Sequence, residues 1–329
     1  MADTLIAKMG SIRGLTVRPL SAVRRYGGLE QDAIEAGRRL GVDAVLDGSV
    51  HNSANGIRVT VRLLRVRDGS QIWTGQFDTP FAGIFSVQDA IVTGLVHELS
   101  FKLTEPERQY LRKHETRNAD AYRAYLLGRY QYNALRRDSM LQSIESYKKA
   151  IALDPQYALA YAGLADTYCV LPISSDFLSG PVSEAAKAAA RKAIALDPLR
   201  SEAHNALGSV KFYYEWDWKG SEEEFRRGIV VNPTNPLPHL RYAHLLSNTG
   251  RHAEGRREVE EALRLDPLWL PANTLAGIFL VNAGQLDAAI VQLKRALEIN
   301  PDYWVARHHL GKACEQKGMI NEALEQYRQ

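Results

Sequence analysis

Hydrophobic and polar residues alternate with a period of two near the start of the chain, and recur with a helical period later. In the segment 57–66 the apolar residues Ile57, Val59, Val61 and Leu63 fall on one face of an extended chain. This alternation predicts a strand. Shorter apolar runs bounded by turn residues predict three further strands, at residues 15–20, 44–52 and 70–77.

Two segments in the same region have a helical pattern. Residues 30–41 end at Gly41, and glycine commonly follows the last turn of a helix. Residues 84–99 place their large apolar side chains on one helical stripe, at Ile84, Val87, Ile91, Leu95 and Leu99. Asn55-Gly56 predicts a turn, and Asp68-Gly69 predicts a two-residue hairpin loop. Residues 1–118 are therefore expected to form a small α/β domain, with a three-strand meander and helices on one side.

Residues 119–329 contain an internal repeat. Five prolines, each preceded by Asp or Asn, are spaced by 43, 35, 34 and 34 residues: Pro155, Pro198, Pro233, Pro267 and Pro301. A small residue precedes each proline by five positions, and Gly250, Gly284 and Gly318 recur every 34 residues. The residue before a proline is disfavoured in the helical conformation, so the preceding helix ends there. Asp and Asn cap helix N-termini, and proline is tolerated at the first helical position. Each pair therefore predicts the end of one helix and the start of the next, and the glycines predict turns within helical hairpins.

These hairpins resemble tetratricopeptide repeats, which have a period of 34 residues. The matching positions are Leu127-Gly128, Tyr161, Leu164, Ala165, Tyr168, Leu207-Gly208 and Leu310-Gly311, with Tyr147, Ala150, Phe225, Ala289, Ala296, Ala323 and Tyr327 in second helices. The resemblance implies an all-α superhelix of about five and a half repeats over 119–329. About nine extra residues lie in the second unit, around 171–180. The sixth unit stops at Gln329 without a polar capping helix, so we expect the native array to run further.

The first 118 residues resemble the TolB amino-terminal-like domain, in the strings GVDAVLDGSV, IRVTVRLLRVRDGSQIWTGQFD and IFSVQDAI. In bacteria that domain often precedes tetratricopeptide repeats, in CadC-like transcription regulators and sometimes in serine/threonine kinases or adenylate cyclases. The resemblance implies a signalling or transcription-regulatory region, cytoplasmic, or periplasmic if the parent protein has an upstream membrane span. The family domain begins with an apolar strand that this chain lacks. We therefore expect an open sheet edge that pairs with another chain, giving a homo-oligomer.

Charge and motifs narrow the function. The net charge of +3 lies in residues 1–118, which hold 16 basic and 13 acidic residues, and no basic face indicates direct nucleic-acid binding. No apolar run is long enough to span a membrane. Cys169 and Cys314 lie far apart, which favours two buried thiols over a disulfide or metal site. Phosphate-binding loops and hydrolase, metalloprotease and kinase signatures are missing, so we expect no enzyme activity and no cofactor.

Four smaller groups have two interpretations each. The adjacent His308 and His309 diverge by about 100° on a helix, which favours a groove residue beside an outward one over a metal site. Asp43 and Asp47 flank a strand, and turn or cap roles are favoured over acid–base chemistry. A solvated sheet face is favoured over an anion-binding surface for Arg58, Arg62, Arg65 and Arg67. Repeat core with a long turn is favoured over an exposed binding patch for Phe212, Tyr213, Tyr214, Trp216 and Trp218.

The tetratricopeptide resemblance also implies a binding groove, because the first helix of each unit lines the concave side. The groove-facing positions are then Tyr122, Tyr125, Arg129, Asp166, Asn205, Ser209, Leu240, His244, Thr274, Ile278, His308 and Lys312. This mixed lining suits an extended acidic peptide, with a partner helix as the alternative. The expected function is a protein- or peptide-binding scaffold. The alternatives are a DNA-binding regulator whose DNA-binding domain lies outside this chain, and an enzyme with an unrecognised site.

Overall fold

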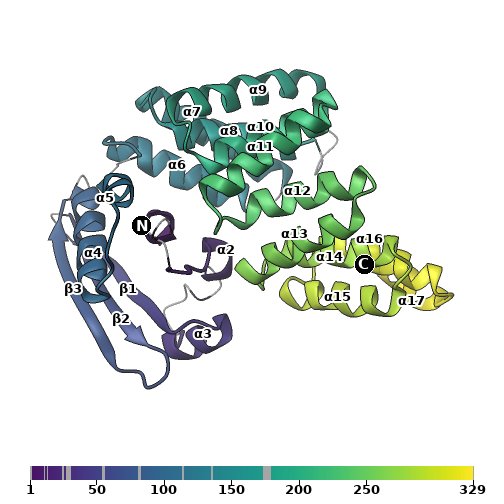
Figure 1. Ribbon diagram of the computed structural model, residues 1–329, viewed down its shortest axis with the longest axis horizontal. Coiled ribbons are helices and arrows are strands. Elements are labelled where there is room, and N and C mark those ends of the chain that lie inside the picture. Colours follow the sequence, from purple (N-terminus) through teal and green to yellow (C-terminus); the bar gives the residue numbers. More distant parts are fainter. Residues whose placement is uncertain are drawn as a thin grey trace.

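The chain folds as a small α/β part followed by an arc of paired helices (Figure 1). The computed structural model describes residues 2–10, 12, 14–23, 26, 31–53, 56–80, 83–112, 115–134, 136–172 and 179–328. The α/β part contains α1 (Ala2–Gly10), α2 (Leu20–Val23), α3 (Ala33–Leu40), β1 (Ala44–Ser53), β2 (Gly56–Arg65), β3 (Gln71–Thr79), α4 (Ile84–Glu98) and α5 (Glu105–Arg112).

The predicted three-strand meander is confirmed, with antiparallel strands in the order β1-β2-β3. The predicted apolar face of β2, from Ile57 to Leu63, is buried. On the opposite face Arg62 donates to Asp47 over 2.6 Å and Arg58 donates to Asp78 over 2.7 Å, each pair joining neighbouring strands. The exposed arginines thus form a solvated sheet face, and Asp47 serves strand pairing. Asn55 lies outside the described residues, so its turn stays a prediction.

Helices α4 and α3 of the α/β part pack on different faces of the sheet. α4 buries Ile84, Val87, Ile91 and Leu95 against the apolar face, and Leu99 packs half-buried at its end. α3 is capped by Asp32 and ends at Gly41 with φ 61°, as predicted. It lies against the other face, where a Cβ built on Gly37 would come within 2.7 Å of Val45. The prediction that the helices share one side is therefore wrong, because Gly37 lets α3 approach the second face closely.

Residues 15–20 do not form the predicted strand. Among the described strands none pairs with them, and Leu15 and Val17 instead pack on the apolar core. Pro19 has no amide to donate to a sheet, and its carbonyl accepts from the amides of Ala22 and Val23, which begins α2. An apolar run forms a strand only where a neighbouring strand accepts its hydrogen bonds.

The loop between β2 and β3 is longer than predicted. It contains four residues, Val66 to Gly69, because the Arg65 amide donates to the Ser70 carbonyl. Val66 is buried, and its amide donates to the Asp43 carbonyl, which continues the register of β1 with β2 by one residue on the side away from β3. Gly69 has φ 72°, so glycine is required here as the sequence suggested, although in a wider loop.

The rest of the described chain forms six helical pairs, which we call units 1–6. They are α6 (Ala119–Tyr132) with α7 (Arg137–Leu153), α8 (Ala158–Val170) with α9 (Ser179–Leu196), α10 (Ser201–Val210) with α11 (Trp218–Val231), α12 (Pro236–Asn248) with α13 (His252–Leu265), α14 (Leu270–Asn282) with α15 (Leu286–Ile299), and α16 (Trp304–Gln316) with α17 (Ile320–Arg328). The predicted turn glycines Gly250, Gly284 and Gly318 all have positive φ. The small residues five before each proline are buried, as close helix packing requires.

The junctions between units differ from the predicted helix caps. Each Asp or Asn before proline ends the preceding helix, and its side chain accepts from the amide two residues on, as between Gln156 and Asp154 at 3.0 Å. The same bond recurs at Asp197, Asn232, Asp266 and Asn300. Proline therefore lies within a short turn, and the next helix begins about one turn later. The prediction that one dipeptide both ends and caps adjacent helices is wrong, since these side chains accept from the amides of a short turn and not from the first turn of the next helix.

A side chain six residues after the proline completes three of these junctions. The proline carbonyls of Pro198, Pro267 and Pro301 are bonded at 2.9–3.0 Å by His204, Asn273 and Arg307 respectively. The same side chains also reach the second helix of their unit. His239, at the equivalent position of unit 4, makes the same kind of contact. The four pairs are His204–Glu224, His239–Glu258, Asn273–Gln292 and Arg307–Gln326. We call this series the polar ladder.

Unit 3 is irregular because its first helix continues as a π-helical turn, Lys211–Glu215. Trp216 then ends the helix with φ 58°, a strained conformation for a residue other than glycine. The aromatic run is therefore divided, with Phe212, Tyr213 and Tyr214 half-buried and Trp216 and Trp218 exposed. The inserted residues of unit 2 include 173–178, which lie outside the described part of the chain.

Candidate functional site

The twelve predicted groove residues do not form one open surface. Seven are buried: Tyr122, Tyr125, Asp166, Asn205, Ser209, Leu240 and Thr274. Three are half-buried, namely Arg129, His244 and Ile278, and only His308 and Lys312 are exposed. The accessible part of the set therefore lies in unit 6.

Several of the buried members are occupied by packing or by their own helix. The Tyr125 ring packs between Tyr147 and Tyr157, with ring centroids 5.8 and 5.1 Å away. The hydroxyls of Ser209 and Thr274 donate to carbonyls one turn earlier in their own helices. These residues stabilise the units themselves, and we assign them no role in recognition.

A second group converges from units 2, 3 and 4 into one polar cluster. Arg241 of α12 donates through Nη1 to the Tyr213 hydroxyl at 3.1 Å, and its Nη2 lies 3.8 Å from Asp166 Oδ1 of α8. The Tyr213 hydroxyl lies 3.0 Å from His244 Nδ1. Asn205 belongs to α10, which packs between α8 and α12. Asp166, Asn205, Tyr213, Arg241 and His244 are called the inner cluster from here on.

The inner cluster contains polar atoms with no hydrogen-bond partner. Among the described residues, both amide atoms of the fully buried Asn205, Oδ1 of Asp166 and Nε of Arg241 are buried and unsatisfied. Leaving one buried polar group unpaired costs about 1–3 kcal/mol. Natural cores seldom retain several such groups together, and those that persist call for a specific reason. A guest that presents both donors and acceptors could bond these atoms only once they become accessible, because they are buried in this structure.

Only two members of the inner cluster carry a charge near neutral pH. Burial, assisted by the charge of Arg241, lowers the pKa of His244 to about 4, so the imidazole is neutral and its Nδ1 accepts from Tyr213. Burial, followed by the charge of Asp166, raises the pKa of the neighbouring Tyr132. Asp166 and Arg241 therefore remain as one anion and one cation. This balance favours a guest without net charge, such as the main chain of a peptide.

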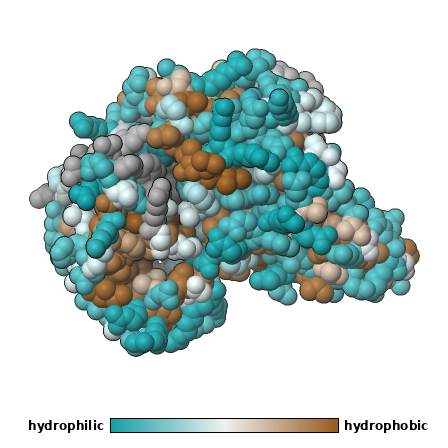
Figure 2. Space-filling view, in the orientation of Figure 1, coloured by the Kyte–Doolittle hydropathy of each residue, from teal (hydrophilic) through white to brown (hydrophobic). Residues whose placement is uncertain are grey.

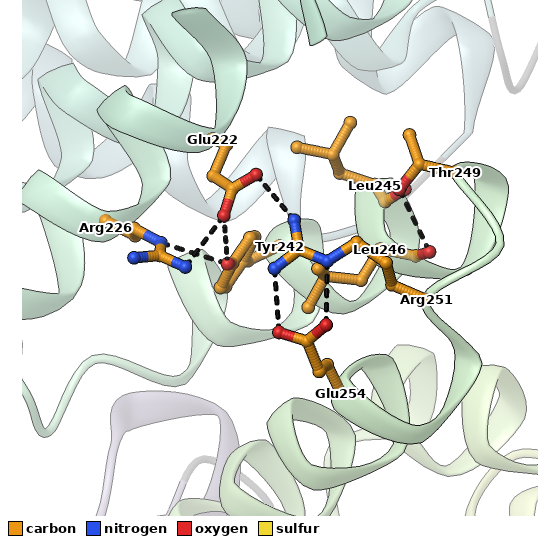
Figure 3. Close-up of polar contacts among 8 residues, drawn as sticks. All are labelled: Glu222, Arg226, Tyr242, Leu245, Leu246, Thr249, Arg251 and Glu254. Atoms are coloured by element: carbon orange, nitrogen blue, oxygen red, sulfur yellow. Dashed lines mark hydrogen bonds and ion pairs between the residues drawn. The ribbon is translucent and has the colours of Figure 1, made fainter. Parts of the chain in front are cut away.

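A polar network on the other side of α12 holds that helix in place (Figure 3). Glu222 of α11 accepts from the Tyr242 hydroxyl at 2.6 Å and from Arg251 at 2.7 Å. Arg251 also makes two hydrogen bonds to Glu254, and Arg226 donates to Tyr242. Since Tyr242 follows Arg241 in sequence, this network ties units 3 and 4 together and fixes the direction in which Arg241 projects.

Two comparisons decide the type of array. A family profile described as "TPR repeat" matches residues 280–318, which comprise the end of α14 and all of α15 and α16. A thermophilic TPR protein of Thermus thermophilus, TTC0263, has a similar structure, with a TM-score of 0.50 over 59% of this chain and 99% of that one, at 18% identity. The helical array is of the tetratricopeptide type.

Other similarities extend beyond the tetratricopeptide core. An IFIT1 monomeric mutant has a TM-score of 0.53 at 14% identity, over 74% of this chain and 54% of that one. A protein of Rhizobium meliloti named putative adenylate cyclase 3 is 29% identical over 168 residues, which are 50% of this chain and 28% of that protein. The chain spans less than a third of the length of the curated relatives it matches.

On the face shown in Figure 2 the tetratricopeptide array is mostly hydrophilic, with apolar areas near the middle of the molecule and over the α/β part. His308 and His309 stack edge to face at 5.2 Å, and His308 also faces the Tyr327 ring. Within the described ranges no group of His, Cys, Asp and Glu could hold a metal ion, and no helix is long and apolar enough to cross a membrane. Both cysteines are free and buried, as predicted.

Sequence reasoning found part of the inner cluster and missed the rest. Asp166, Asn205 and His244 were among the predicted groove positions, and the structure brings them together. Arg241, the cation of the cluster, was missed because the repeat pattern selects Leu240 and His244 on this helix and passes over the positions between them. Tyr213 was seen only as one member of an aromatic run, since the π-helical turn that directs it to Arg241 leaves no clear signal in the sequence.

Proposed function

We propose that this chain is a protein- or peptide-binding scaffold that recognises an extended peptide through the inner cluster. The observation that carries the proposal is the set of unsatisfied polar atoms on Asp166, Asn205 and Arg241, contributed by three successive units. An extended peptide exposes amide donors and carbonyl acceptors along its main chain, so it could satisfy groups of both kinds.

The tetratricopeptide fold supports this proposal, because such arrays present long curved surfaces to partners. The exposed His308 and Lys312 lie at the far end of the array and could contact acidic side chains of the same peptide. A bound peptide would then run from the inner cluster in units 2–4 towards unit 6. A helical partner remains the alternative.

We further propose that the chain is the sensory or interaction region of a bacterial signalling or transcription-regulatory protein. The cyclase-named relative supports this, since it is much longer than the stretch that matches this chain. In this proposal residues 1–118 and 119–329 are separate domains, the first of the TolB amino-terminal-like type. We also propose homo-oligomerisation through β1. Among the described strands β1 pairs with β2 alone, so its outer edge could pair with a strand of a second copy.

Substitution of Asn205 tests the binding role. Asn205→Leu keeps the branched arrangement of heavy atoms and removes two unsatisfied polar atoms, which offsets the cost of its larger methyl groups, so we expect the unfolding free energy to change by less than about 1 kcal/mol. Peptides would be selected from a random phage-displayed library on the full chain, and their affinities measured by fluorescence anisotropy. We expect Asn205→Leu to weaken binding at least about tenfold although the stability of the fold is almost unchanged.

Three charge reversals complete the test. Arg129→Glu and Lys312→Glu should lower the affinity of the chain for an acidic peptide. Arg67→Glu, on an exposed loop of the α/β part, should leave this affinity unchanged. If no peptide is enriched, or if Asn205→Leu binds as tightly as the parent chain, the inner cluster is not the recognition site.

A further inference from the structure

Apart from Glu115, which lies between α5 and α6 and pairs with Arg200 at the start of unit 3, the described residues of the α/β part contact the array at two separate places, which differ in chemistry. At unit 1 the contact is continuous with the apolar core, and the Phe85 ring of α4 meets the Tyr122 ring of α6 edge to face, with centroids 5.4 Å apart. The Tyr122 hydroxyl, which is buried, also bonds Thr4 of α1 and Gln88 of α4, each at 3.0 Å. The aromatic and apolar nature of this contact makes it the stronger attachment.

The second contact is polar and lies at unit 4, across the arc. Thr234, in the turn before α12, donates its hydroxyl proton mainly to Asn232 Oδ1 at 2.9 Å, and its oxygen lies 3.5 Å from the Gly10 carbonyl oxygen at the end of α1. Arg18 donates to the carbonyls of Arg264 and Leu265, at 2.6 and 3.2 Å, where α13 ends. Figure 1 shows α1 and α2 lying inside the arc, with α2 beside α13.

Arg18 binds the ends of two helices that belong to different parts of the molecule. Its Nε donates to the Leu40 carbonyl at 2.9 Å, in the last turn of α3, while Nη1 reaches the last turn of α13. The last carbonyls of a helix lack partners within it and carry partial negative charge, so a guanidinium is a favourable ligand for both. One side chain therefore closes the ring between the α/β part and unit 4.

We propose that Arg18 and the Gly10–Thr234 contact form a latch, and that the contact at Tyr122 is the pivot about which the molecule opens. With the latch closed, α1 and α2 occupy the inner side of the array next to units 1, 3 and 4. With the latch open, the α/β part remains attached at unit 1, and the inner side becomes available to a guest. This proposal rests on the proposed peptide-binding function, since the latch would control access to that surface.

The contact at Gly10 permits a reversible lock. A Cβ built on Gly10 would lie 3.2 Å from Thr234 Oγ1, so the double variant Gly10→Cys/Thr234→Cys brings two thiols within disulfide reach. The native Cys169 and Cys314 are buried and should not compete. We expect the lock to form under mild oxidation of the full chain. We also expect it to form about tenfold more slowly when Arg18→Ala is added, because the two thiols then meet less often.

The lock is then tested on binding of a peptide selected as described above. We expect the oxidised chain to bind this peptide at least about tenfold more weakly than the reduced chain, with affinity restored by dithiothreitol. Arg38→Ala is the matched control, because Arg38 is an exposed arginine of α3 that pairs only within its helix. Equal rates of lock formation in Arg18→Ala and Arg38→Ala, or equal peptide affinity of oxidised and reduced chains, would overturn the latch.

A distance measurement keeps the latch testable if no peptide is found. Spin labels on Arg39→Cys in α3 and Val291→Cys in α15, both exposed positions, report the distance across the ring. We expect Arg18→Ala to lengthen and broaden this distance, and Arg38→Ala to leave it unchanged. Circular dichroism shows whether Arg18→Ala is folded, and Arg18→Lys replaces it if not. An unchanged distance in both Arg18 variants refutes opening even where peptide binding itself is confirmed.

Discussion

Removal of His204 should destabilise unit 3 in a manner that depends on pH. His204 Nδ1 lies 2.7 Å from a Glu224 carboxylate oxygen, and Nε2 lies 2.9 Å from the Pro198 carbonyl oxygen. Both partners can only accept hydrogen bonds, so both ring nitrogens must carry protons and the buried imidazole is a cation. His204→Ala removes this cation. Glu224 then keeps one cation within hydrogen-bond distance, Lys211, at 3.3 Å.

The size of the effect follows from the two bonds lost. A hydrogen bond to a charged group contributes about 1.5–3 kcal/mol, and breaking a buried ion pair costs about 3–5 kcal/mol. Because Lys211 stays beside Glu224, we expect less than the full cost of breaking a buried ion pair. His204→Ala should lower the unfolding free energy by about 2–3 kcal/mol near pH 6.

The pH dependence follows from the direction of the pKa shift. The hydrogen bond with Glu224 raises the pKa of His204 above its ordinary value of about 6.5, against the opposing effect of burial. A raised pKa stabilises the fold fully below the unfolded value, and this contribution is lost as the pH rises through the folded value. The difference between the parent chain and His204→Ala should therefore be largest near pH 6 and smaller in alkaline solution. In acid, burial tends to raise the pKa of Glu224, but the bond from His204 and the charges of Lys211 and His204 together outweigh burial and lower this pKa below its ordinary value, so the pair is weakened only once Glu224 is protonated.

Urea denaturation at about pH 6 and about pH 9, combined with amide hydrogen exchange over α10 and α11, measures the difference. His51→Ala, an exposed histidine of β1 that bonds only Ser49, is the control and should show almost no change. A stability loss in His204→Ala that is the same at both pH values, or greater at the higher one, refutes the assignment of a cationic His204.

Three further predictions concern packing, backbone strain and thiol chemistry. Gly208→Ala should lower the unfolding free energy by about 1–3 kcal/mol, since the added Cβ would lie 2.7 Å from the buried Phe225 ring; thermal denaturation measures this, and no loss would contradict the tight packing. Trp216→Gly should raise the unfolding free energy by up to about 1 kcal/mol, because Trp216 is 73% exposed and its φ is positive. A clear fall in unfolding free energy, measured by the same thermal denaturation, would show that the indole packs in solution. Cys169 and Cys314 should resist maleimide until the chain is unfolded in urea, because both are buried and burial raises the pKa of each thiol; labelling of the folded chain, detected by mass spectrometry, would disprove this.

Signals confined to a few neighbouring residues were read correctly from the sequence. Gly41 ends α3 in the left-handed conformation and Gly284 turns the chain between α14 and α15, because only the local backbone decides whether glycine is needed. The alternation of β2 likewise predicted its buried face. The segment 15–20 was misread because strand formation depends on a neighbour far along the chain, which a local pattern does not reveal.

The polar ladder could have been found in the sequence, whereas the inner cluster could not. The residue six after four of the prolines is a hydrogen-bond donor, from His204 to Arg307, and this periodicity is visible without coordinates. The approach of Arg241 to Asp166 depends on how units 2, 3 and 4 are rotated relative to one another. That rotation is set by the π-helical turn and by the network around Glu222, neither of which follows from the repeat pattern.

The π-helical turn has a consequence for engineering the protein. An added residue in a helix rotates all later positions of that helix by about 100°. In unit 3 the added residue is accommodated by a longer first helix, which ends in the π-helical turn, and by a shorter turn after it. Exchanging unit 3 for a standard thirty-four-residue module would remove this adjustment while keeping every buried apolar position. The resulting protein would be well folded yet misaligned, with α13 carried away from Arg18. Chimeras built from idealised modules should therefore preserve stability and forfeit the contact between the two ends of the arc.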